Sequence, residues 1–316
     1  MEPLNRSYER KRISTMSFGL VLLLACTVGV SYVLYALVQW FVPAFFTDPE
    51  GSGWLASVSQ YLIATPVCAL MISLVPADRM EKYSLHLRDI RRFFLISCMV
   101  LFFGNLLGWA AETGVARLLH LPAENPAETL LNNYSLLFGL VTSVVLAPIT
   151  EEWIFRKLLI DRLNRLGDAA AIGYSALLFG LFHANLRQFF YAFGIGLVFG
   201  YIYVRTGKLR YTILLHMLIN LLFGVLPTLT PEVNLTVLGQ SISLTLLLWT
   251  LFEAVLAVAG LVSLIRSRKL FRLRRGWVDL PGGHWGGLAF GNAGTLILLL
   301  LCGLLFAANL TGYFGL

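Results

Sequence analysis

Charged residues are scarce in this chain. Of its 316 residues only 13% are Asp, Glu, Lys or Arg, whereas 58% are hydrophobic, and the mean hydropathy is +0.76. A typical soluble domain carries about 25% charged residues. The composition therefore excludes an ordinary soluble globular protein and predicts an integral membrane protein.

Cysteine is rare as well, and no two cysteines form a Cys-x-x-Cys pair. All four, Cys26, Cys68, Cys98 and Cys302, lie inside apolar runs. Redox and metal-binding thiols usually come in closely spaced pairs, so we interpret these four as packing or lipid-facing residues. Long repeats and low-complexity linkers are also missing, and we expect residues 1–316 to form a single integral membrane domain.

Apolar runs long enough to cross a bilayer dominate the sequence, because a spanning helix needs about 20 such residues. The candidates are 18–45, 54–75, 93–116, 134–158, 169–186, 189–204, 211–228, 242–265 and 289–312. We therefore expect an all-α, polytopic membrane helical bundle of about nine transmembrane spans, with eight possible. The short fifth and sixth runs could instead form one re-entrant hairpin. Two motifs, Gly104-xxx-Gly108 and Gly196-xxx-Gly200, predict close approach between helices.

Lys and Arg are distributed unevenly between the connections. If the spans alternate from a cytoplasmic N-terminus, 22 of the 24 Lys and Arg residues fall on inner segments. Cytoplasmic loops carry this excess of positive charge, so we predict a multi-pass protein of the cell membrane with its C-terminus outside. The same loops account for the net charge of +7 without a nucleic-acid partner, and membrane lipid is the expected surrounding.

Ionisable and polar side chains interrupt the apolar runs at three places. They are Glu151, Glu152 and Arg156, then His183, then His216 and Asn220. A charge at the centre of a membrane helix costs about 2.5–3.5 kcal/mol on insertion scales, so such residues are by default functional. Taken singly, each group could also be a structural ion pair or a hydrogen bond between helices. Glu253 lies in a different apolar run and could line a cavity or pair with a basic group.

The positions of Glu151 and His183 predict that they lie at one depth. The segments 134–165 and 168–186 are expected to form two antiparallel helices, with Gly167 as a C-terminal cap between them. Glu151 and His183 lie 15 and 17 residues from this turn. At 1.5 Å per residue, both are about 23–26 Å from it.

His216 reaches the same level if this hairpin projects about 10–15 Å into the cytoplasm, because it lies about 9 Å inside its own helix. Residues four apart share a helix face, which pairs Glu152 with Arg156, Phe179 with His183, and His216 with Asn220. A carboxylate and an imidazole at one point can activate water as a general base, and a second His and an Asn can stabilise an oxyanion. Glu151, His183 and His216 could instead hold Zn²⁺.

These motifs carry a resemblance. Glu151-Glu152-xxx-Arg156, Phe179-xxx-His183 and His216-xxx-Asn220, in this order and each in an apolar helix, resemble the signature of the CPBP family. These are the CAAX protease and bacteriocin-processing intramembrane proteases, also called the Abi or lysostaphin resistance protein A-like family. The resemblance covers about residues 135–225, the expected protease core.

The resemblance implies a glutamate-dependent endopeptidase acting on a membrane-associated or prenylated protein or peptide. By motif match, Glu151 is the general base and His183 helps to hold the water. Glu152 and Arg156 position the first carboxylate, His216 and Asn220 form the oxyanion site, and Phe179 lines the substrate cavity or serves as a packing residue. For the family, metal participation has been argued both ways, so Zn²⁺ on Glu151, His183 and His216 stays an open alternative.

Other chemistries have little support in the sequence. It lacks the Gly-x-Gly-Asp motif of aspartyl intramembrane proteases and the His-Glu-x-x-His motif of helix-borne zinc proteases. The rival interpretation is a non-catalytic membrane protein, either a proton-coupled transporter or a bacteriocin-immunity scaffold. Transporters often contain paired repeats with interrupted helices, and the sequence shows no such pairing.

Overall fold

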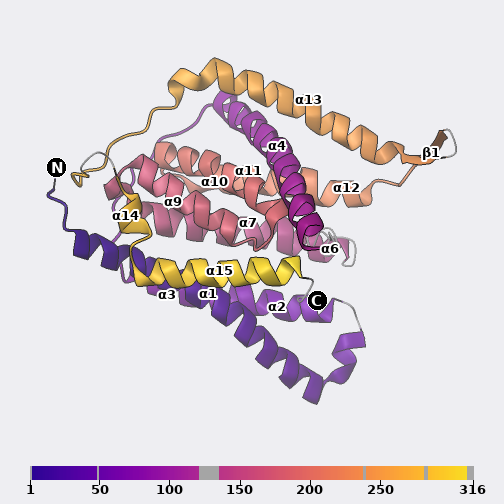
Figure 1. Ribbon diagram of the computed structural model, residues 1–316, viewed down its shortest axis with the longest axis horizontal. Coiled ribbons are helices and arrows are strands. Elements are labelled where there is room, and N and C mark those ends of the chain that lie inside the picture. The colour runs from indigo at the N-terminus through magenta and orange to yellow at the C-terminus, as the bar shows by residue number, and fades with distance from the viewer. Residues whose placement is uncertain (1, 48–49, 121–134, 238–239, 281–283, 312–316) are drawn as a thin grey trace.

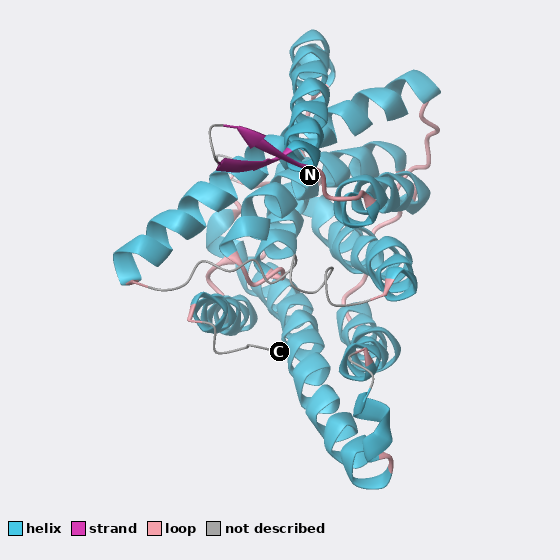
Figure 2. Ribbon diagram, turned by 90° about the vertical axis from the view of Figure 1, so that its right-hand side faces the viewer, coloured by secondary structure: helices cyan, strands magenta, loops and turns pink. Residues whose placement is uncertain are grey.

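The computed structural model describes residues 2–47, 50–120, 135–237, 240–280 and 284–311. Figure 1 and Figure 2 show a molecule built almost wholly of helices, which confirms the all-α polytopic bundle. The C-terminal residue, predicted to lie outside the cell, falls outside the described residues.

The elements follow one another as these segments. They are α1 Arg6–Phe41, η1 Pro43–Thr47, α2 Gly51–Val58, η2 Ser59–Ala64, α3 Thr65–Ser73, α4 Leu87–Leu119, α6 Leu136–Gly139, η3 Leu140–Leu146, α7 Ala147–Glu151, η4 Glu152–Ile160, α8 Asp161–Leu163, η5 Asn164–Leu166, α9 Asp168–Leu181, α10 Leu186–Thr206, α11 Leu209–Ile219, η6 Asn220–Val225, α12 Leu226–Leu229, β1 Asn234–Val237, β2 Gln240–Ser243, α13 Leu244–Ser267, η7 Arg268–Leu270, α14 Gly286–Ala289 and α15 Ala293–Leu310. Segments that continue one another without a break form single long helices.

Within the described residues, 8 helices are long and apolar enough to cross a membrane. They agree with eight of the predicted spans. The exception is the predicted span 169–186, where α9 has only 14 residues. At 1.5 Å per residue α9 is about 21 Å long, short of the roughly 30 Å hydrocarbon core of a bilayer. The chain turns back after Leu181, and His183 lies in that turn.

Proline explains three widened stretches in these helices. The π-helical segments η2, η3 and η6 each end two residues before a proline: Pro66, Pro148 and Pro227. Proline has no backbone N–H and its ring clashes with the carbonyl four residues earlier. The chain upstream widens to bonds between residues five apart, a geometry that is frequent at functional sites.

The helices lie in three layers in Figure 1. The first layer holds α1, α2, α3 and α15, the middle layer α7 to α11, and the third α4 and α13. The hydroxyls of Ser17, Tyr174 and Thr295, from α1, α9 and α15, bond one another at 2.7–3.0 Å and tie the first layer to the middle one. These polar groups are buried and satisfied, so they hold helices together where the hydrophobic effect is absent.

The predicted glycine motifs bring α10 close to its neighbours. A methyl group on Gly104 of α4 would lie 2.5 Å from the Tyr191 Cα of α10. A methyl group on Gly196 of α10 would lie 2.8 Å from the Ala176 Cα of α9. Only glycine permits these approaches, and together they fix α10 against the helix that leads to His183.

The loops predicted to be inside gather at one end of the bundle, which we call the basic end. There the Arg12 guanidinium donates to the carbonyls of Pro76 and Arg162, both at 3.0 Å. Gly167 caps the first half of the central hairpin with a φ of +105°, as predicted. The basic segments therefore share one side of the bundle, and the assignment of that side to the cytoplasm stays a prediction.

A small antiparallel hairpin of β1 and β2 follows α12, with Asn234 opposite Ser243. Nothing in the apolar pattern predicted it. It lies between α12 and α13, away from α7 and α9 (Figure 1).

Candidate functional site

A fully buried ion pair forms the base of the site. Glu152 and Arg156 have side chains with 0% exposure, and Arg156 Nε lies 3.0 Å from Glu152 Oε2. Arg156 also donates from Nη2 to Glu152 Oε1 at 3.2 Å. This is the i,i+4 pair that the sequence predicted. A buried charge is tolerated only with a partner and further hydrogen bonds, so the two residues act as a unit.

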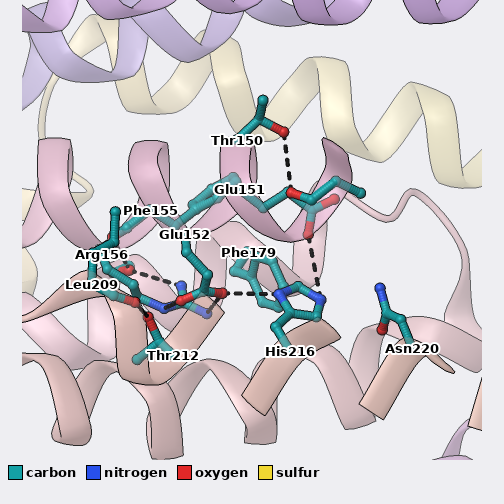
Figure 3. A network of polar contacts seen from close by, with 12 residues as sticks. Thr150, Glu151, Glu152, Phe155, Arg156, Phe179, Leu209, Thr212, His216 and Asn220 are labelled. Carbon is teal, nitrogen blue, oxygen red and sulfur yellow. Dashed lines mark hydrogen bonds and ion pairs between the residues drawn. The ribbon is translucent and has the colours of Figure 1, made fainter. Parts of the chain in front are cut away.

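His216 joins this pair to the neighbouring carboxylate. Its Nδ1 lies 3.1 Å from Glu152 Oε1, and its Nε2 lies 3.9 Å from Glu151 Oε2 (Figure 3). Glu152 is held as a carboxylate by Arg156, so it accepts the hydrogen bond and Nδ1 carries the proton. The imidazole is thus fixed with its other nitrogen facing Glu151.

Phe179 is the apolar centre of the cluster. The Arg156 guanidinium carbon lies 4.6 Å from the centroid of its ring, a cation–π contact. The rings of His183 and His216 approach the same ring edge-on, with centroids 5.0 and 5.9 Å away. Phe179 is therefore both a packing residue and part of the cavity wall.

His183 lies in the turn after α9 and has a fixed tautomer. Its Nδ1 lies 2.8 Å from the Phe179 carbonyl. A carbonyl only accepts, so Nδ1 carries the proton and Nε2 is an acceptor. The next residue, Ala184, has a φ of +54°, which is unusual for a residue with a side chain. Asn309 of α15 donates to the Ala184 carbonyl at 3.0 Å and holds this turn in place.

A small cavity of about 90 Å³ opens beside Glu151 and His183. It has room for several water molecules. The lining residues are Leu23, Gln60, Thr65, Thr150, Glu151, Ile154, Phe155, Phe179, Phe182 and His183. The Glu151 side chain is 25% exposed whereas that of Glu152 is fully buried, so of these two carboxylates Glu151 is the one that reaches water.

Asn220 is the one predicted site residue that stands apart from the cluster (Figure 3). Its side-chain amide donates to the Ser143 carbonyl at 2.7 Å and ties η6 to η3. The Asn220 N–H bonds the His216 carbonyl, so the two residues keep α-helical spacing and Asn220 lies one turn beyond the cluster. The oxyanion role of Asn220 stays a prediction.

Sequence reasoning missed one wall of the cavity. Leu23, Gln60 and Thr65 come from α1, η2 and α3, a part of the chain to which no motif pointed. It also missed two buried hydroxyls near Arg156, those of Ser175 and Thr212. Ordinary residues in apolar spans carry no signal of this kind, because only packing shows which face looks into a cavity.

Glu253 does not belong to the site. It lies on α13, which packs on α4. It does not line the cavity.

The residues present do not form a ready metal site. In the described ranges, no group of three His, Cys, Asp or Glu side chains is placed to hold a metal ion. Zinc sites in enzymes take three protein ligands and a water. His216 Nε2 and Glu151 Oε2, 3.9 Å apart, face each other, but the third donor is not in position with them.

Comparison with known proteins identifies a family to which part of the chain is similar. Residues 133–222 match the family model described as type II CAAX prenyl endopeptidase Rce1-like. Two curated relatives match as well. "Putative membrane peptidase YdiL" of Bacillus subtilis (strain 168) is 31% identical over 96 residues, which are 30% of this chain and 39% of that protein. "Membrane-embedded CAAX protease MroQ" of Staphylococcus aureus (strain USA300) is 33% identical over 95 residues, 28% of this chain and 38% of that protein.

The matched segment of the chain is similar to the CPBP family. The matched segment contains the elements of the CPBP motifs, from Glu151 to Asn220, whereas the cavity wall from α1, η2 and α3 lies outside it. The alignments span less than two-fifths of the length of these relatives. No solved structure matches the chain significantly. With the eight apolar helices, the family identifies a multi-pass protein of the cell membrane.

Proposed function

We propose that this protein is an intramembrane endopeptidase in which Glu151 activates a water molecule to hydrolyse a peptide bond. The observation that carries the proposal is the contrast between the two adjacent glutamates. Glu151 reaches the cavity, while Glu152 is buried and paired with Arg156. The Glu151 carboxylate can therefore take part in proton transfer, whereas the Glu152 carboxylate holds Arg156 in place.

The water would be held between two acceptors. Glu151 and His183 both line the cavity, and the tautomer of His183 leaves its Nε2 unprotonated. Glu151 takes a proton as the water oxygen bonds to the carbonyl carbon of the substrate. When the tetrahedral intermediate breaks its C–N bond, the same proton passes to the leaving amine.

His216 and the ion pair would support this step. The Nδ1 contact with Glu152 fixes the His216 ring, so that Nε2 stays at 3.9 Å from Glu151 and can exchange the proton with it. Glu152 and Arg156 are positioning residues in this scheme. Asn220 keeps its proposed place as an oxyanion donor, for which its amide would turn from the Ser143 carbonyl toward the cavity.

The proposed substrate is a membrane-associated or prenylated protein or peptide, and the proposed protease core is 135–225. The family description names CAAX prenyl endopeptidases, and the name of the Staphylococcus aureus relative includes CAAX protease. CAAX sequences end in a prenylated cysteine followed by three residues. A site between apolar helices suits a lipidated chain, because the prenyl group can stay in the bilayer.

The test is cleavage by the purified full-length protein in detergent. The probes are internally quenched peptides with a C-terminal Cys-a-a-X sequence, each made with and without a farnesyl group on the cysteine. Glu151→Gln keeps the shape of the side chain and removes the base, so cleavage should be lost. Glu253→Gln is the matched control, since it makes the same change inside the membrane but away from the cavity. A folded Glu151→Gln protein that cleaves at the unaltered rate would refute the proposal.

A further inference from the structure

The wall of the cavity opposite the CPBP motifs contains an amide side chain that no motif includes. This is Gln60, which lines the same space as Glu151 and His183. It comes from η2, in the second spanning helix, outside the segment that matches the family model. The other residues of that wall are Leu23 and Thr65.

The backbone around Gln60 is fixed by its own sequence. Pro66 lies just beyond η2, and the Thr65 N–H and hydroxyl both bond the Gln60 carbonyl, the hydroxyl at 2.8 Å. The preceding Ser59 is buried and donates to the carbonyls of Cys26 and Thr27 at 3.2 and 2.9 Å. Gln60 is therefore held on a rigid, widened turn that is anchored on α1.

The hydrogen-bond donors around the cavity are otherwise engaged. Thr65 donates to the Gln60 carbonyl, and Thr150 donates to the Leu146 carbonyl at 2.7 Å. Asn220 donates to Ser143. Gln60 is half-buried, and its side-chain amide has no hydrogen-bond partner among the described residues. A half-buried amide without a protein partner can bond water or a ligand in the cavity it faces.

We propose that Gln60 is a further catalytic residue, whose side-chain amide donates a hydrogen bond to the carbonyl oxygen of the peptide bond under attack. This inference rests on the proposed peptidase function. Glu151 and His183 hold the water on one wall, and Gln60 on the facing wall binds the oxygen on which negative charge develops. The substrate carbonyl then lies between α7 and η2, so spans outside the family core take part in the reaction.

The test compares Gln60→Met, which keeps the length of the side chain and removes its donor, with Gln60→Glu, which keeps the shape but has no N–H when ionised. Loss of one oxyanion donor typically lowers kcat by about 10²–10³-fold. We expect both variants to show a fall of this order, with KM changed far less and thermal stability in detergent unchanged. Gln39→Met is the matched control, because Gln39 is exposed on α1 and does not line the cavity.

The possible results separate this inference from the proposed function. If Glu151→Gln abolishes cleavage while both Gln60 variants keep the unaltered kcat, Gln60 is not a donor in the reaction and the inference is wrong. A change in KM alone would also overturn it, since the interaction would then be equal in substrate and transition state. If Glu151→Gln is fully active, the proposed function itself fails.

Discussion

Glu151 and Glu152 are adjacent in the chain but face opposite nitrogens of the His216 ring, at 3.9 and 3.1 Å. One imidazole thus connects the carboxylate that reaches the cavity with the carboxylate buried on Arg156. This relationship predicts that the two glutamates respond differently to the same substitution.

Glu152→Gln should destabilise the protein, whereas Glu151→Gln should not. The first change leaves Arg156 without its buried counter-charge, and breaking a buried pair costs about 3–5 kcal/mol. The second changes a side chain that is 25% exposed and makes no buried ion pair. Thermal unfolding in detergent measures both. Equal melting temperatures for the two variants would contradict the assignment of Glu152 to structure.

Arg156→Lys should not preserve the function of the ion pair. Arg156 contacts both oxygens of Glu152, and its guanidinium carbon lies 4.6 Å from the centroid of the Phe179 ring. A lysine carries one compact charge and cannot make the same two contacts. We expect a lower yield of folded protein together with reduced cleavage, measured by size-exclusion chromatography and the quenched peptides. A Lys variant with unaltered yield and activity would show that charge alone is sufficient.

Asn220→Ala should lower both activity and stability. Loss of an oxyanion donor costs about 10²–10³-fold in rate, and loss of the bond to the Ser143 carbonyl removes a tie between η6 and η3 worth about 1 kcal/mol. Activity and melting temperature are measured on the same preparation. A fall in melting temperature with no fall in kcat would restrict Asn220 to a structural role.

Chelators should leave cleavage intact if Glu151 acts on water directly. The described residues place no third ligand with Glu151 and His216, so the scheme needs only side-chain groups. The assay is peptide cleavage after dialysis against 1,10-phenanthroline or EDTA, followed by metal analysis of the purified protein. Loss of activity that returns with added Zn²⁺ would establish the alternative in which Glu151, His183 and His216 bind metal.

Asp78→Asn should stabilise the protein at neutral pH. Asp78 lies in the loop at the basic end, and burial raises the pKa of its carboxyl above the usual value despite the nearby Arg165 and Arg12. Its Oδ2 is buried without a hydrogen-bond partner among the described residues. Since the folded state binds this proton more tightly, the free energy of unfolding decreases as the pH rises through the raised pKa.

The advantage of the Asn variant should therefore be present at pH 7 and vanish below about pH 4, where Asp78 is protonated in both states. Melting temperatures across this range in detergent give the comparison. Equal stability of the two proteins at every pH would show that the carboxylate is well solvated after all.

Much of the bundle could be predicted from hydropathy, because a bilayer allows only long apolar helices or closed barrels. The shared depth of Glu151 and His183 could be predicted from residue counts, and both residues line one cavity. The early end of α9 could not be predicted, since its apolar run continues past Leu181. The turn there uses Ala184 at positive φ where glycine would have been a recognisable signal.

The direction of Asn220 was hidden for a different reason. His216 and Asn220 do share a helix face, since the Asn220 N–H bonds the His216 carbonyl. The Asn220 amide is nevertheless turned to the Ser143 carbonyl of η3, a contact between helices that no local pattern reports. The pairing of Glu152 with Arg156 survives inside the π-helical η4 because the long arginine side chain can reach back. The facing wall with Gln60 depends on contacts between distant helices, which no local pattern reports.

The three prolines that follow π-helical segments change the direction in which later side chains point around the helix axis. Each residue of an α-helix turns its side chain by about 100° around the axis, and a π segment holds one residue more than the α turn it replaces. The widened turn that precedes Pro148 therefore rotates everything downstream relative to everything upstream. Pro148 is not among the residues that line the cavity. It nevertheless helps to set the direction in which the Glu151 side chain points around the helix axis. The geometry of the site therefore depends on a residue that takes no part in the chemistry.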